Sequence, residues 1–190
     1  MKTPGYHAIK KLVREKISKH PKDSILFVVT PSERYVAVNL AITDYLVNDK
    51  KLCGIYLTLN KPFNSISKML KELKVNLSSL LFLDGASALI GIKPTDSNCL
   101  LLQSPSALTD MSIALSKATK GGNMKFFILD SFSAMLIYNN ENSAVQFTHS
   151  VIGLLRKNSM TGIILALDKD MDKKFLGSVI QFCDGVIRIK

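Results

Sequence analysis

The chain has 190 residues, of which 47% are hydrophobic and 21% are charged, and its formal net charge is +10. These values predict one compact globular domain with a sizeable core, and they exclude a chain that is disordered over most of its length. The longest apolar runs are far shorter than the ~18 residues that a membrane span needs. The first residues carry charges without the apolar core of a secretory signal, so we expect a cytoplasmic protein with no membrane span.

Residues 1–22 hold seven basic residues and one acid, and they predict a basic amphipathic helix over 6–19 that ends at His20 and Pro21. The apolar residues at helical spacing are Ile9, Leu12, Val13 and Ile17. We expect this apolar face to pack on the core and the basic face to be solvated. The alternative is a nucleic-acid-binding surface. It would be formed by Lys10, Lys11, Arg14, Lys16 and Lys19.

Beyond residue 22, short apolar segments alternate with helical segments. Strands are predicted at 25–29, 52–58, 80–83, 99–103, 125–129, 162–167 and 186–189. Helices are predicted at 31–48, 62–73, 106–120 and 171–182, with one or two more in 132–158 and irregular structure at 86–97. This alternation predicts a doubly wound α/β fold with a parallel sheet. No linker or repeat divides residues 23–190, so we treat them as one domain.

Ligands of parallel α/β sheets bind beyond the carboxyl ends of the strands. The residues predicted to lie there are Thr30, Asn60, Ser104, Asp130 and Asp168. A function that depends on a small molecule should use some of them. The three cysteines and three histidines are isolated and share no metal-ligand spacing, so we expect neither a disulfide framework nor a metal site.

The first strand runs into a helix through the turn TPSE, where a nucleotide-binding α/β protein has its phosphate loop. Residues 29–40 lack the glycines, lysine and hydroxyl of the GxxxxGK[ST] spacing. Thr30 to Glu33 instead match a capping box with proline at the first helical position, which predicts a helix that begins at Pro31. Glu33 would then occupy the helix end where a phosphate would bind. The alternatives are an atypical anion site, to which Arg34 would add a free cation, and a plain corner.

Several stretches together resemble the RecA-like ATPases of the KaiC group. They are SILFVVTPSERYVAVNLAITDYL, IYLTLNKPFNSISKML, FFILDSFSAML and VIQFCDGVIRIK, in this order, and they span nearly all of residues 24–190. Each stretch alone is at most moderately specific, but the four in order are considerably more so. The resemblance implies a three-layer RecA-like domain with a mostly parallel central sheet. It also implies that the 163–167 strand lies between the 25–29 and 125–129 strands.

The sequence departs from this family at the residues that perform its chemistry. The phosphate loop is missing, and Asn60 and Lys61 stand where the family has paired glutamates, one of which activates water. Neither an amide nor an ammonium group is a general base at neutral pH. Asp130 and Ser131 remain, and by resemblance Asp130 would assist Mg²⁺ through water. We favour a structural role for Asp130, in which it caps the next helix or orients the 131–136 turn.

We therefore expect a non-catalytic, degenerate KaiC/RecA-like protein that binds a protein partner in regulation or signalling, and a pseudo-ATPase in place of an enzyme. No cofactor is expected. The rival interpretation is an atypical ATP-binding protein or weak ATPase that uses ATP and Mg²⁺, and a third is a nucleic-acid-binding module. A nucleotide site would use Thr30, Ser32, Glu33, Arg34, Asp130 and Ser131. Family members often form rings, so the resemblance leaves both a monomer and a homo-oligomer open.

Overall fold

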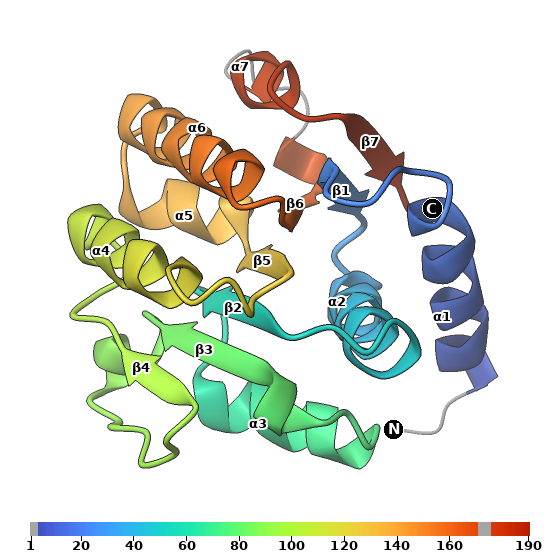
Figure 1. Cartoon of the computed structure of the whole chain (residues 1–190), viewed down its shortest axis with the longest axis horizontal. Coiled ribbons are helices and arrows are strands. Elements are labelled where there is room, and N and C mark those ends of the chain that lie inside the picture. Colours follow the sequence, from blue (N-terminus) through green and yellow to red (C-terminus); the bar gives the residue numbers. More distant parts are fainter. Residues whose placement is uncertain (1–3, 171–175) are drawn as a thin grey trace.

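Seven parallel strands form the central sheet of the computed structural model, which describes residues 4–170 and 176–190 (Figure 1). The strands are β1 (Ile25–Thr30), β2 (Gly54–Thr58), β3 (Leu80–Asp84), β4 (Cys99–Leu101), β5 (Phe126–Asp130), β6 (Thr161–Leu167) and β7 (Gly185–Arg188). Their order across the sheet is β4-β3-β2-β5-β6-β1-β7. The predicted place of β6 between β5 and β1 is therefore confirmed, as is the three-layer α/β architecture.

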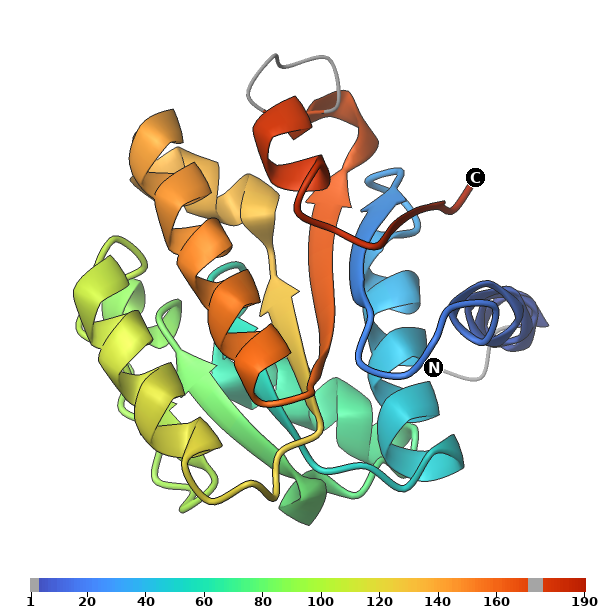
Figure 2. The same cartoon turned by 45° about the horizontal axis from the view of Figure 1, so that its top comes forward.

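Helices cover both faces of the sheet (Figures 1 and 2). They are α1 (Pro4–Ile17), α2 (Tyr35–Asp44), α3 (Phe63–Glu72), α4 (Leu108–Thr119), α5 (Phe132–Tyr138), α6 (Glu141–Lys157) and α7 (Leu176–Ile180). Helices α1 to α3 enclose one apolar cluster against the sheet, and α4 to α7 enclose the other. The continuous apolar strands predicted this arrangement, because a strand that is covered on both faces needs apolar residues at successive positions.

Helix α1 packs on the core as its apolar spacing predicted, and it lies beside α2. Val13 and Ile17 are buried in the same cluster as α2 and the sheet. Polar contacts add to this packing, since Tyr6 donates a hydrogen bond to Asp44 at 3.1 Å and the Lys10 ammonium lies 2.9 Å from the same carboxylate. The N-terminal helix is thus held to the α/β core by both apolar and charged contacts.

Several element boundaries differ from those predicted. Helix α2 begins at Tyr35 and continues into a π-helix over Tyr45–Asp49. Strand β2 begins at Gly54, because residues 51–53 lie outside the ladder, and strand β4 ends at Leu101. The expected irregular segment contains a 3₁₀ turn at Ser87–Ile90. Part of the helix predicted at 171–182 lies outside the described residues, and α7 covers Leu176–Ile180. None of the helices within the described ranges combines the length and apolar character that a membrane crossing requires.

The stretch CDGVIRIK secures the edge of the sheet next to β1. Asp184 accepts a hydrogen bond from the buried backbone N–H of Ile25 at 2.7 Å and another from Arg156 at 2.9 Å. Partial burial alone would raise the pKa of Asp184, but the contacts with Arg156 and Ile25 outweigh it and hold the pKa below its ordinary value. This carboxylate therefore connects α6, β1 and the start of β7.

Replacing Asp184 with Ala should lower the free energy of unfolding by about 1–3 kcal/mol at neutral pH, because the Ile25 N–H loses its acceptor. Asp184→Asn keeps an acceptor oxygen and should cost less. A lowered folded-state pKa means that the carboxylate stabilises the fold above its unfolded pKa and that this stabilisation is lost as the pH falls through the folded pKa. Urea unfolding should therefore show that the free energy of unfolding of Asp184→Ala comes closer to that of the wild type in acid. Glu15→Gln, on the exposed side of α1, is the control. If Asp184→Ala lost as much stability in acid as at neutral pH, the contribution of the ionised carboxylate would be contradicted.

Candidate functional site

A fully buried carboxylate, Asp130, lies at the carboxyl end of the central strand β5. Tyr56 donates a hydrogen bond to its Oδ2 at 2.7 Å, and the Asn39 amide donates to the same oxygen at 2.9 Å. The hydroxyl of Tyr35 donates to Oδ1. Both carboxylate oxygens are therefore occupied as acceptors by side chains of the protein itself. We call Tyr35, Asn39, Tyr56 and Asp130 the Asp130 network.

The fold explains why these four side chains meet. Tyr56 lies on β2, which pairs directly with β5. Tyr35 and Asn39 are four residues apart on α2, so they occupy the same face of the helix, and this face packs on the sheet. Asn39 Nδ2 also lies 2.6 Å from the Tyr56 hydroxyl. The side-chain carbonyl oxygen of Asn39, Oδ1, is buried and has no hydrogen-bond partner among the described residues. The network thus joins the helix that follows β1 to the two strands in the middle of the sheet.

Burial dominates the electrostatics of the network. It raises the pKa of Asp130 above its ordinary value, and the hydrogen bonds from Tyr35, Tyr56 and Asn39, with the nearby charge of Lys61, oppose this rise without cancelling it. Burial and the Asp130 charge raise the pKa of both tyrosines well above the usual range. The phenols therefore remain protonated at neutral pH and keep donating to the carboxylate.

The capping box predicted at the β1–α2 corner is wrong. Residues 32–34 form turns, α2 begins at Tyr35, and its N-cap residue is Arg34, which makes no side-chain cap. The buried Thr30 hydroxyl donates to the carbonyl of Pro31 at 3.4 Å and accepts nothing from Glu33. The reason is that the turn places Glu33 outside the helix, where its side chain is exposed.

The remaining corner residues do not gather around one ligand position. Ser32 and Glu33 are exposed, and neither lines the cavity at this edge. Arg34, the free cation of the atypical anion-site alternative, donates a hydrogen bond to the carbonyl of Lys190. Ser131 caps α5 by accepting from Ala134 N–H at 3.0 Å. The cap that we assigned to Asp130 is therefore made by its neighbour, and the Asp130 carboxylate faces the network instead.

A small cavity of about 170 Å³ lies beside the network at the carboxyl edge of the sheet. Its polar lining includes Tyr35, Asn60, Ser131 and Lys169, and its apolar lining includes Ile137. Ile137 is 75% exposed, and the adjacent Tyr138 is 37% exposed, which leaves an apolar surface at the end of α5. Of the residues that stand for the family's glutamates, Asn60 lines the cavity, and Lys61 contributes its charge near Asp130.

The other two predicted strand-end residues do not join this cavity. Ser104 bonds locally, with its hydroxyl 2.7 Å from that of Ser106. Asp168 begins a 3₁₀ turn after β6 and is not among the cavity residues. Among the described residues, no group of three or more His, Cys, Asp or Glu side chains could hold a metal ion.

The basic face of α1 is only partly available to a partner. Lys10 is paired with Asp44 and with Asp49, at 2.9 and 3.0 Å, so its charge is used within the fold. Lys11, Arg14 and Lys19 are exposed, and Lys16 is half-buried. The structure thus retains an exposed basic surface on this helix, but a smaller one than the sequence alone predicted.

Sequence reasoning missed three members of the Asp130 network: Tyr35, Asn39 and Tyr56. A signal was present, because Asn39 interrupts the apolar helical run VAVNLAI and Tyr56 interrupts the apolar strand GIYLT. A polar side chain inside an apolar run is expected to find a buried partner. What the sequence did not give was the identity of that partner.

Comparison with solved structures supports the architecture. A KaiC-like protein from the hyperthermophilic archaeon Pyrococcus horikoshii OT3 superimposes with a TM-score of 0.64 at 10% identity, covering 88% of this chain and 71% of that chain. The chain has a KaiC/RecA-like fold. An uncharacterized protein from Pyrococcus horikoshii, in complex with an unknown peptide, superimposes with a TM-score of 0.72 at 14% identity, covering 95% of this chain and 82% of that one. The sequence matches no family model and no curated protein.

Replacing Tyr56 with Phe should lower the free energy of unfolding by about 1.5–3 kcal/mol at pH 7, because the Asp130 carboxylate loses a donor. The folded-state pKa of Asp130 should then rise further. A carboxyl with a raised folded-state pKa stabilises the fold most below its unfolded pKa, and this contribution is lost as the pH rises through the folded pKa. Urea unfolding should therefore show the deficit of Tyr56→Phe shrinking as the pH falls to about 4. Tyr138→Phe is the control. A loss of unfolding free energy in Tyr56→Phe that did not change with pH would count against a hydrogen bond from Tyr56 to the ionised Asp130.

Proposed function

We propose that this protein is a non-catalytic member of the KaiC/RecA-like fold that has lost the phosphate loop and acts by binding a protein partner in regulation or signalling. The observation that carries the proposal is the occupancy of Asp130. A carboxylate that assists Mg²⁺ needs an oxygen free to accept from the water of the metal shell. Asp130 is 0% exposed, and both of its oxygens accept from protein donors.

The surroundings of Asp130 support the same conclusion. Tyr35 lies at the start of the helix that would follow a phosphate loop, and its hydroxyl reaches Asp130. Arg34, the cation nearest the corner in sequence, is bound to the Lys190 carbonyl. Asn60 and Lys61 supply no carboxylate that could activate water. A nucleotide would have to displace the protein's own contacts at Asp130 and Arg34.

A peptide-binding role is supported by two separate observations. The apolar end of α5 is exposed at Ile137 and Tyr138, beside a cavity whose lining includes hydroxyl, amide and ammonium groups. Exposed apolar groups next to a few polar ones are typical of protein-binding surfaces. In addition, a solved structure of the same fold holds a peptide. We therefore place the partner site at the carboxyl edge, over the end of α5.

Titration with Mg-ATP should give no saturable heat, so that any dissociation constant is weaker than about 1 mM, and no thermal stabilisation or turnover. The reason is that Asp130 is fully buried and that each of its oxygens already accepts from a protein donor. Calorimetry measures the binding of Mg-ATP, and a phosphate-release assay measures its turnover. Saturable binding with turnover, weakened by Arg34→Gln or Asp130→Asn but not by the exposed Lys157→Gln, would establish the atypical ATPase in its place.

Peptides selected from a displayed random library on the immobilised protein should lose at least about tenfold in affinity on Ile137→Ser, because truncating a central apolar anchor typically costs 2 kcal/mol or more. Fluorescence anisotropy with the selected peptides measures the change. Ile113→Ser is the matched control, since Ile113 is 50% exposed on α4. Equal losses in the two variants, or selection of no saturable binder, would remove the support for this surface.

A further inference from the structure

A second and larger cavity lies at the opposite edge of the sheet, where β1, β5 and β6 begin. Its volume is about 660 Å³, which is within the range of small-molecule sites. Its apolar lining comes from three separate elements and includes Ile17 of α1, Leu26 of β1 and Leu46 of the π-helix. None of the residues predicted for a nucleotide site lines it. This amino-edge pocket is therefore independent of the Asp130 network.

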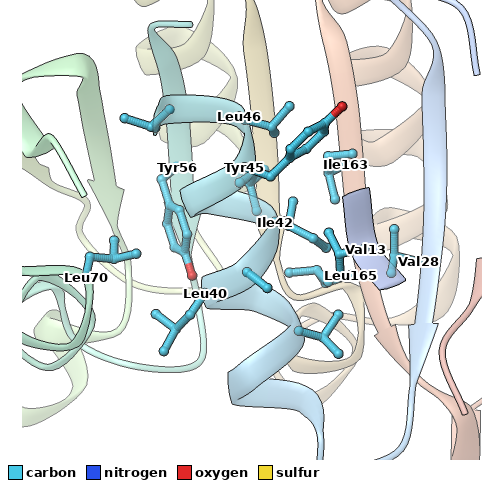
Figure 3. Close-up of a cluster of buried hydrophobic side chains, with 14 of the residues drawn as sticks. Val13, Val28, Leu40, Ile42, Tyr45, Leu46, Tyr56, Leu70, Ile163 and Leu165 are labelled. Atoms are coloured by element: carbon cyan, nitrogen blue, oxygen red, sulfur yellow. The ribbon is translucent and has the colours of Figure 1, made fainter. Parts of the chain in front are cut away.

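Tyr45 presents an unused polar group to the amino-edge pocket. Its side chain lines the pocket and is only 2% exposed. Within the part of the chain that the structure describes, its hydroxyl makes no hydrogen bond. Figure 3 shows the hydroxyl pointing past Ile163 toward the amino ends of the strands, away from the apolar side chains below it. The hydroxyl is therefore available to hydrogen-bond a group that enters the pocket.

A local change of helix geometry accompanies this placement. Tyr45 opens the π-helix, and the Lys50 N–H bonds back to the Tyr45 carbonyl at 3.0 Å, five residues away. π-helical turns are rare and occur frequently at functional sites. The same turn brings the Lys50 ammonium to 5.5 Å from the centre of the Tyr45 ring. The π-helix therefore supplies the hydroxyl in the wall, and the residue that follows it supplies a cation near the Tyr45 ring.

The charge of the pocket lining is positive. Lys22, Lys50 and Lys125 line it together with His20, and Asp23 is its one acidic residue. The three lysines are exposed at the rim, whereas Leu26, Tyr45 and Leu46 are buried. An apolar interior under a cationic rim complements a molecule that has an apolar body and an anionic end.

We propose that the amino-edge pocket binds a small amphipathic anion, with its alkyl or aryl body against Leu26, Leu46 and the Tyr45 ring. The carboxylate or phosphate end lies between the rim lysines, and an oxygen atom of the ligand hydrogen-bonds the Tyr45 hydroxyl. The site needs no nucleotide and no contact with the carboxyl edge. It therefore adds a ligand-binding function to the partner-binding function proposed above.

Calorimetry with decanoate, decyl phosphate and decanol tests this site at low salt. We expect saturable binding with one ligand per chain for at least one of the two anions, and binding at least tenfold weaker for decanol. Decanoate and decyl phosphate distinguish a carboxylate ligand from a phosphate ligand. Tyr45→Phe should weaken the anion about five- to tenfold while leaving the unfolding midpoint unchanged, because the hydroxyl has no partner in the described fold to lose.

The double variant Lys50→Met with Lys125→Met should weaken the anion by at least tenfold and leave decanol binding unchanged. The matched control is Lys93→Met with Lys157→Met, in which two exposed lysines outside the pocket lose their charges. Anion binding that is weakened by Lys50→Met with Lys125→Met, but not by the control pair, supports the site. No saturable binding of either anion, equal binding of decanol, or equal weakening by the control pair would overturn the proposal.

Discussion

The Asp130 carboxylate is the centre on which the arrangement of this protein depends. A carboxylate with no exposed surface is costly unless its oxygens are well satisfied, and here donors from Tyr35, Asn39 and Tyr56 satisfy both of them. Two donors belong to α2 and one to β2, while the acceptor belongs to β5. One set of hydrogen bonds therefore fixes the position of the helix after β1 relative to the middle of the sheet, in addition to the apolar packing around it.

The same use of strand-end carboxylates recurs elsewhere in the sheet. Asp84, fully buried at the end of β3, accepts from the Phe63 N–H at 2.8 Å and from the Ser87 hydroxyl at 2.6 Å. Asp184 accepts from the Ile25 N–H just before β7. Acidic residues at the carboxyl ends of parallel strands often serve chemistry, yet Asp84 and Asp130 act as internal acceptors, as Asp184 does at the amino end of β7. The carboxylates in the stretches FFILD and CDGVI therefore hold the scaffold together.

The sequence predicted the fold better than the site because the two depend on different information. Apolar runs such as ILFVVT and FFILD predict buried parallel strands wherever they occur, and the alternation with helices leaves few other arrangements. The prediction for the corner between β1 and α2 was wrong because Thr30 to Glu33 fit a capping box locally, whereas α2 begins later, at Tyr35. The partners of Asp130 could not be predicted, since Asn39 and Tyr56 lie 91 and 74 residues away from it. Only the completed packing brings such distant residues into contact.

The two ends of the sheet differ in how their polar groups are satisfied, and this difference locates ligand binding. At the carboxyl edge, the side-chain carbonyl oxygen of Asn39 is buried inside the network without a hydrogen-bond partner among the described residues, and no ligand can reach it. At the amino edge the Tyr45 hydroxyl faces a cavity that is open at a rim of lysines. A polar group that lacks a partner and faces open space provides binding energy to a ligand, whereas one enclosed by packing only reduces stability. On this scaffold, small-molecule recognition is therefore expected away from the edge where a nucleotide would bind.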